Sequence, residues 1–142
     1  ENTVFEILDK EKHITSIENM NLFRNNVEKK KSNLLNLVKG LKKNDCKIFG
    51  IGAAARASTL INYVGLNNYL DAVLEVKGSK KIGFYMSGTQ IPIYDEEILI
   101  KENPEYLLLL SWHISDILIT KLKNRGYNGK FIIPLPEPTI IE

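Results

Sequence analysis

The chain has 142 residues, of which 44% are apolar and 25% are charged, and its formal net charge is +2. This composition is typical of one globular domain with its own core, and the net charge is too close to zero to indicate nucleic-acid binding. The single cysteine, Cys46, excludes a disulfide framework and a cysteine-based zinc site, and no apolar run approaches the roughly 20 residues that cross a bilayer.

These features predict a cytoplasmic domain that binds neither a membrane nor nucleic acid. The chain begins at Glu1 without an initiator methionine, so we expect it to be a domain cut from a longer protein. We treat residues 1–142 as one domain, with a helical lead-in over residues 1–45 and a sheet core over residues 46–138.

The lead-in is dominated by one long helix. Residues 1–15 contain a short apolar patch that suits a strand or the edge of a hairpin, and the pattern assigns them no element. From Ser16, a suitable N-cap, apolar residues recur at helical spacing as far as Leu41, and the helix ends at Asn44. The three lysines at 29–31 lie on the opposite face and indicate a solvated surface.

In the core, strands and helices alternate along the chain. The expected strands are residues 47–51, 70–76, 91–94, 106–110 and 130–134. The expected helices are residues 53–64, 95–103 and 115–125, and Pro136 and Pro138 are expected to end regular structure. The alternation predicts an α/β fold, a Rossmann-like, three-layer, open and mostly parallel sheet with helices on both faces and right-handed crossovers.

The joint between the first strand and its helix carries the clearest motif. Gly50 and Gly52 stand where residues without a Cβ permit positive φ and close approach, and Ala55 fills the third small position of a loose dinucleotide fingerprint. The following helix N-terminus offers N–H groups to an anion, and Arg56 in its first turn adds a full charge. The same glycines also suit a turn that packs on its own sheet and binds nothing, so both interpretations stay open.

Further candidates follow other predicted strand ends. Glu75 lies about 20 residues beyond the glycines, where dinucleotide-binding domains place an acidic residue on a ribose hydroxyl, although it equally suits a solvated strand end. His113, one of two histidines, follows Trp112 and is a weak candidate for a general base or phosphate ligand, or a histidine that caps or packs. The sequence contains no nucleophile elbow, metalloprotease motif or Walker loop, so it predicts no metal site and no catalytic machinery.

Four blocks, at residues 50–63, 81–93, 109–114 and 130–136, together resemble the C-terminal domain of S-adenosylmethionine-dependent sugar C-methyltransferases. The resemblance implies a protein with a zinc-binding N-terminal module, a central domain that binds S-adenosylmethionine, and this domain, which helps to hold a nucleotide-diphosphate-linked keto-sugar. It also implies that a base deprotonates the carbon beside the sugar ketone and that the enolate attacks the methyl group, as in deoxysugar biosynthesis.

The resemblance assigns the methyl donor and the base to modules outside this chain. The isolated domain is therefore expected to bind no cofactor and to be inactive. Its expected partners are the nucleotide sugar and the methyltransferase domain of the same polypeptide.

The family's Gly-x-Gly-Ala turn falls on Gly50, Gly52 and Ala53, and its basic position falls on Arg56, where lysine is commoner in the family. The first-turn N–H groups and Arg56 suit a diphosphate.

The family's Pro-Gly-Thr-His-Ile-Pro block reads Ser-Gly-Thr-Gln-Ile-Pro at residues 87–92, and these two departures leave the ligand preference of the loop open. Gly88 and Thr89, together with Trp112 and His113, are expected to shape a cleft that faces the partner domain.

Two other functions remain open. One is an NAD-type dinucleotide-binding domain of regulatory or redox character, with Glu75 on a ribose. The other is a structural module whose glycine turn binds no ligand.

Overall fold

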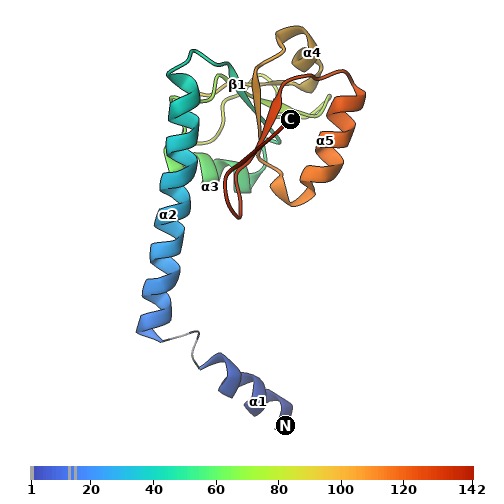
Figure 1. Ribbon diagram of the computed structural model, residues 1–142. Helices are drawn as coiled ribbons and strands as arrows, with labels where there is room; N and C mark the ends of the chain where they lie inside the picture. The colour runs from blue at the N-terminus through green and yellow to red at the C-terminus, as the bar shows by residue number, and fades with distance from the viewer. Residues whose placement is uncertain (1, 13, 15) are drawn as a thin grey trace.

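The computed structural model describes residues 2–12, 14 and 16–142, and its core is a six-stranded sheet with helices on both faces (Figure 1). The strands lie in the order β3-β2-β1-β4-β5-β6. The first five pair in parallel, and β6 joins β5 in antiparallel fashion. Their bounds are β1 Ile48–Ile51, β2 Ala72–Glu75, β3 Ile93–Asp95, β4 Tyr106–Leu109, β5 Lys130–Ile133 and β6 Thr139–Ile141. The predicted Rossmann-like, mostly parallel sheet is confirmed.

The strand order reverses between β1 and β4, which lie side by side at the centre of the sheet. The chain passes from β1 to β2 on one side of this point, and from β4 to β5 on the other. All four residues of β1 are buried, because a central parallel strand is covered on both faces. In open sheets of this kind, ligands bind outside the carboxyl ends of the strands at the point of reversal.

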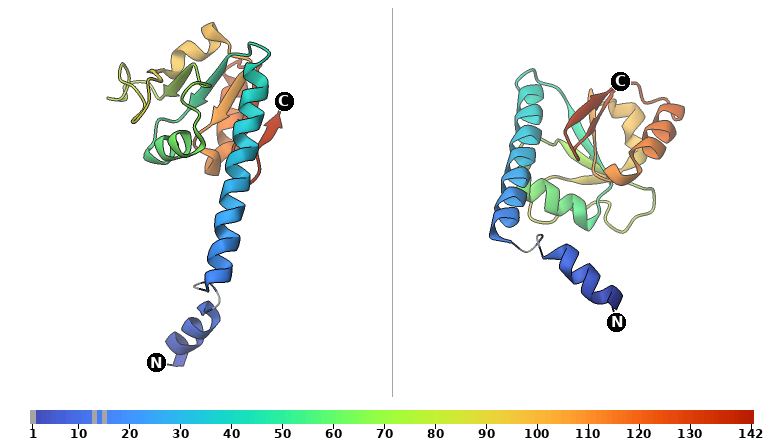
Figure 2. Two further views of the ribbon diagram at one scale, coloured as in Figure 1. Left: turned by 90° about the vertical axis from the view of Figure 1, so that its left-hand side faces the viewer. Right: turned by 60° about the horizontal axis from the view of Figure 1, so that its bottom comes forward.

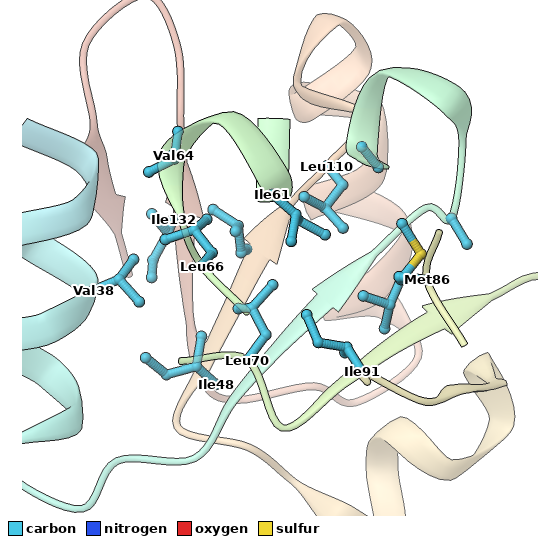
Figure 3. Close-up of a cluster of buried hydrophobic side chains, with 14 of the residues drawn as sticks. Val38, Ile48, Ile61, Val64, Leu66, Leu70, Met86, Ile91, Leu110 and Ile132 are labelled. Carbon is cyan, nitrogen blue, oxygen red and sulfur yellow. The ribbon is translucent and has the colours of Figure 1, made fainter. Parts of the chain in front are cut away.

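Helices α2 (Ile17–Lys42) and α3 (Ala55–Val64) cover one face of the sheet. Val38 from α2 and Ile61 from α3 are buried in one cluster with the strand residues Ile48 and Ile132 (Figure 3). The buried Ala57 gives α3 a small side chain where it approaches the sheet.

The opposite face is covered by α4 (Leu99–Glu102) and α5 (Ser115–Asn124), each preceded by a short 3₁₀ helix, η1 (Glu96–Ile98) and η2 (Trp112–Ile114) respectively. Leu99 and Leu122 from these helices are buried with Tyr127 and Phe131. The rings of the two aromatic residues meet edge to face, with centroids 5.2 Å apart. The predicted three layers are therefore confirmed.

The acidic run at the start of the third predicted helix has two roles. Asp95 caps η1, because its Oδ1 accepts the N–H of Glu97 at 2.8 Å. Glu96 is buried and binds two side chains from the end of α5, with Arg125 at 2.6 Å and Lys121 at 3.2 Å. These ion pairs of Glu96 join segments that are distant in sequence, so helix-capping rules alone did not indicate them.

At the N-terminus the long helix begins as predicted, with the Ser16 hydroxyl accepting the N–H of Asn19 at 3.2 Å. The chain before it forms a further helix, α1 (Asn2–Glu11), where the sequence pattern suited a strand or hairpin edge but assigned no element. Val4 and Leu8 are spaced as on one helix face, and the patch was too short to reveal this period. Figures 1 and 2 show α1 and the first half of α2 extending away from the sheet. None of the helices described has both the length and the apolar composition for a membrane crossing.

The expected end of regular structure at Pro136 and Pro138 was also wrong. Both prolines lie in the turn that precedes β6, where no ladder hydrogen bond is required of them, and the sheet continues to Ile141 instead of ending at residue 138. Lys30 of α2 holds this turn, since its Nζ donates to the Pro136 carbonyl at 2.7 Å and to Glu137 at 2.6 Å.

Candidate functional site

The two glycines of the β1–α3 joint are required by the packing of the neighbouring strand. Gly52 has φ +97°, and a Cβ at this position would lie 2.5 Å from Oγ of Ser111, just after β4. A Cβ on Gly50 would lie 2.7 Å from Cδ1 of Leu110. Of the two glycines only Gly52 has a positive φ, and the atoms that approach both are side-chain atoms of the chain itself, where a ligand or another backbone was expected.

Residue 53 is held on both sides of its backbone. Its N–H donates to Oε2 of Glu75 at 2.9 Å, and its carbonyl accepts a hydrogen bond from Nζ of Lys81 at 2.6 Å. Lys81 also lies 3.5 Å from the Glu75 carboxylate. Glu75 and Lys81 therefore fix the turn immediately before α3, with Ala53 itself buried.

This arrangement decides what Glu75 can offer a cofactor. In dinucleotide-binding domains, an acidic side chain at the end of β2 accepts hydrogen bonds from the ribose hydroxyls of NAD. The other oxygen of Glu75 accepts the N–H of Val76 at 3.0 Å, and its side chain is only 13% exposed. Both oxygens of Glu75 therefore already accept backbone hydrogen bonds from the chain itself.

The N-terminus of α3 is the accessible part of the joint. Ala54 occupies the N-cap position and has no side-chain oxygen to cap the helix. Within the part of the chain that the structure describes, no hydrogen bond occupies the N–H groups of Ala55 and Arg56. Both residues are exposed, so these donors and the partial positive charge of the helix end face solvent.

Arg56 extends from this helix end to the residues that follow β4. Its Nη2 lies 3.1 Å from Nε2 and 3.2 Å from Nδ1 of His113, so the guanidinium donates to the imidazole. The guanidinium carbon also lies 5.7 Å from the centroid of the Trp112 ring. Arg56, Trp112 and His113 thus form one cluster at the point where strand order reverses. Both His113 and Arg56 are exposed, and their cluster offers positive charge beside an aromatic surface.

Gly88 and Thr89 are not part of this cluster. A Cβ on Gly88 would lie 2.8 Å from Oδ1 of Asn62, about 10 Å along α3 from its first residue at the helical rise of about 1.5 Å. The Thr89 hydroxyl donates to the Met86 carbonyl and accepts the N–H of Ile91, so it closes a local turn. The structure brings together six of the nine predicted site residues, which are Gly52, Ala53, Arg56, Glu75, Trp112 and His113, and separates Gly88 and Thr89 from them. The ninth, Gly50, is buried within β1 against Leu110 and Val73.

Sequence reasoning missed a cavity of about 300 Å³ on the other side of the α3 N-terminus. The loop after β2 contributes Lys80, Lys81, Phe84 and Tyr85 to its lining, and α3 contributes Ser58. Residues 80–85 lie between two predicted strands, at 70–76 and 91–94, where no helix or strand was predicted. The available signal was the pair of adjacent aromatic residues in an otherwise polar segment.

Metal-ligating residues do not gather at this edge of the sheet. Among residues 2–12, 14 and 16–142, no three His, Cys, Asp or Glu side chains lie close enough to hold an ion together. The second histidine of the sequence, His13, lies outside the described residues.

The strand order and the glycine turn define an α/β domain of the Rossmann-like class. The profile of the family described as the C-methyltransferase C-terminal domain matches residues 1–136, and the chain therefore belongs to that family. It is also 30% identical over 115 residues to C-methyltransferase NovU of Streptomyces niveus. This match covers 80% of the chain and 27% of NovU, so the chain spans about a quarter of that relative's length. The family resemblance seen in the sequence is confirmed.

Proposed function

We propose that this domain is the substrate-binding and scaffold module of an S-adenosylmethionine-dependent C-methyltransferase that methylates a nucleotide-linked keto-sugar. The observation that carries the proposal is the uncapped N-terminus of α3 beside Arg56, Trp112 and His113, at the point of strand reversal. A diphosphate fits this place because it accepts hydrogen bonds from the free N–H groups and pairs with the guanidinium. Trp112 and His113 then border the attached sugar.

The methyl donor belongs to another domain of the same polypeptide in this proposal. The engagement of Glu75 with its own turn supports that division, since both of its oxygens already accept backbone hydrogen bonds at the place where a dinucleotide-binding domain would hold a ribose. His113 is assigned to sugar binding and not to catalysis, and the isolated domain is expected to transfer no methyl group.

The projecting helices supply a surface for the methyltransferase domain. On α1, Phe5 is 70% exposed, and on α2, Ile17 and Phe23 are 80% and 71% exposed. Monomeric domains rarely leave contiguous apolar surface of this kind uncovered. Because the chain spans only about a quarter of NovU, we assign this surface to the same-chain methyltransferase domain.

The proposal is tested by replacing Arg56 with alanine in a full-length enzyme that carries this domain. Loss of a charged donor to a diphosphate is expected to weaken binding of a deoxythymidine diphosphate sugar by about tenfold or more, measured by calorimetry. Lys101→Ala, at an exposed position of α4, is the matched control and should leave the affinity unchanged.

Unchanged affinity in Arg56→Ala would remove the diphosphate from this site. NAD serves as the parallel ligand: saturable binding of NAD, without binding of the sugar nucleotide, would favour the dinucleotide-binding function instead. Binding of neither ligand by the full-length enzyme through this domain would leave a structural module.

A further inference from the structure

We propose that the turn between α5 and β5 is a site of spontaneous covalent modification, at which Asn128 loses its amide nitrogen and becomes aspartate or isoaspartate. Residues 128 and 129 read Asn-Gly, and no other asparagine of the sequence is followed by glycine. The turn lies at the edge where the parallel strands begin, away from α3 and the proposed diphosphate site (Figure 1). The inference is independent of the proposed function.

The reaction needs only the chain itself and water. The backbone nitrogen of Gly129 attacks Cγ of Asn128, so that a nitrogen–carbon bond forms and the bond from Cγ to Nδ2 breaks. Ammonia leaves with the proton of the attacking nitrogen, and a cyclic imide remains. Water then opens this ring at either carbonyl. Opening at Cγ restores the normal backbone with aspartate at residue 128, whereas opening at the backbone carbonyl leaves the chain running through Cγ, as isoaspartate.

The structure leaves both reacting groups available. Asn128 is exposed, and within the part of the chain that the structure describes its side-chain amide has no hydrogen-bond partner. The N–H of Gly129 donates no hydrogen bond within the same part of the chain, although the N–H of the next residue, Lys130, is held by the Glu105 carbonyl at 2.9 Å. Because glycine has no Cβ, its nitrogen is also the least hindered that the chain can offer.

Asn68 provides a comparison within the same chain. It is exposed in a turn, as Asn128 is, and among the described residues its side chain likewise has no hydrogen-bond partner. The residue that follows it is Tyr69, whose N–H donates to the Leu66 carbonyl at 3.0 Å. A bulky side chain and an engaged N–H therefore both hinder the same attack at Asn68.

The isoaspartate product does not fit the packing of the turn. Gly129 lies so close to Tyr127 and Pro104 that a Cβ on it would come 2.6 Å from the Pro104 carbonyl oxygen. Isoaspartate adds a carbon atom to the backbone immediately before this glycine, so the hydrogen bond from the Tyr127 hydroxyl to the same carbonyl, at 3.0 Å, is disturbed. Aspartate keeps the length of the backbone and changes only the charge of an exposed side chain. Isoaspartate alone is therefore expected to destabilise the fold.

The test is to incubate the folded 142-residue chain and to digest it with trypsin, which releases residues 126–130 as one peptide. Mass spectrometry of this peptide, against synthetic standards that contain aspartate or isoaspartate, measures both products. Conversion at Asn128 is expected to be at least about tenfold faster than at Asn68, because glycine leaves the attacking nitrogen unhindered. Asn128→Gln should abolish the conversion, since its longer side chain would have to close a larger ring, and should fold normally, since the position is exposed.

Asn128→Asp is the control that separates the two products. This variant should unfold at the same urea concentration as the fresh wild-type chain, whereas the incubated wild-type chain should show an additional transition at lower urea, in proportion to its isoaspartate content. Equal conversion at Asn128 and Asn68, or none at Asn128, would overturn the proposal. Conversion only in the urea-unfolded chain would overturn it as well, because the folded turn would then hold the amide away from the nitrogen. Unchanged unfolding of a chain rich in isoaspartate would contradict the expected misfit.

Discussion

At the scale of single residues, the argument for ligand binding rests on the residues next to the two glycines and not on the glycines themselves. Gly52 is needed because its φ is +97°, and a Cβ on Gly50 would have to displace the buried Leu110 side chain, so both positions favour glycine with or without a ligand. The uncapped end of α3 and the contact between Arg56 and His113 have no such structural cause. A glycine turn alone therefore identifies the fold, whereas the groups around it carry the argument for binding.

Tyr127 gives a residue-scale prediction for the core. Its hydroxyl donates to the Pro104 carbonyl at 3.0 Å, and burial raises the pKa of Tyr127 above its ordinary value. Replacing it with phenylalanine leaves the Pro104 carbonyl unpaired and is expected to lower the free energy of unfolding by about 1–3 kcal/mol at neutral pH. Urea denaturation of the isolated chain measures this change.

The raised pKa of Tyr127 also predicts a pH dependence. Below the ordinary tyrosine pKa of about 10, both folded and unfolded chains keep the proton, and stability is independent of this group. As the pH rises further, the unfolded chain loses the proton first, so stability falls. Between about pH 10 and 12 the wild-type chain should therefore lose more stability than Tyr127→Phe. Equal losses in the two proteins would show that Tyr127 titrates normally in the folded state.

At the scale of elements, the sequence predicted the buried strands and α2, α3 and α5 because their apolar periodicity is long and regular. The N-cap of α2 was also predictable, since Ser16 acts on a neighbour three residues away. The antiparallel β6 was not, because its pairing with β5 is set by the turn through Pro136 and Pro138 and by Lys30 of α2, which is distant in sequence. Capping residues and apolar periodicity therefore predicted the elements that depend on nearby residues, but not the strand pairing that depends on distant ones.

The same limit applied to the candidate site. Arg56, Trp112 and His113 were predicted because parallel strands bring their carboxyl ends to one edge of the sheet. Gly88 and Thr89 were assigned to the same cleft by family resemblance, but their loop packs on Asn62 farther along α3. The engagement of Glu75 with Ala53 was equally hidden, because it depends on the exact register of two strands and a turn.

The two halves of α2 are expected to respond differently to mutation. Leu34, 1% exposed, packs on the sheet, and Leu34→Ala should lower the free energy of unfolding of the isolated chain by about 2–5 kcal/mol. Phe23, 71% exposed in the projecting half, should change it by no more than about 0.5 kcal/mol when replaced by serine. Urea denaturation compares the two variants.

In a full-length enzyme, replacing Phe23 is expected to have a larger effect than in the isolated chain, because the methyltransferase domain is proposed to cover this side chain. Phe23→Ser should then increase proteolytic cleavage between the domains, while a serine at the polar, exposed position Asn21 should not. A strong destabilisation of the isolated chain by Phe23→Ser would mean that this surface already packs within the domain.

At the scale of the whole molecule, the proposal divides binding between domains, and this division is separable by truncation. A full-length enzyme without this domain is expected to keep its affinity for S-adenosylmethionine within about twofold, since the proposal assigns that cofactor to the other domain, while losing the proposed diphosphate contacts at Arg56. Nucleotide-sugar binding, measured by calorimetry, should then weaken by at least tenfold. Methyl transfer, measured in a turnover assay, should fall with it. The 142-residue chain, added back at high concentration, should restore part of the transfer, because the substrate is positioned by one domain and methylated by the other.

If the truncated enzyme binds and methylates the sugar as well as the complete one, the domain holds no substrate. If the isolated chain binds S-adenosylmethionine, the cofactor does not belong to the other domain, and the division proposed for this molecule is wrong.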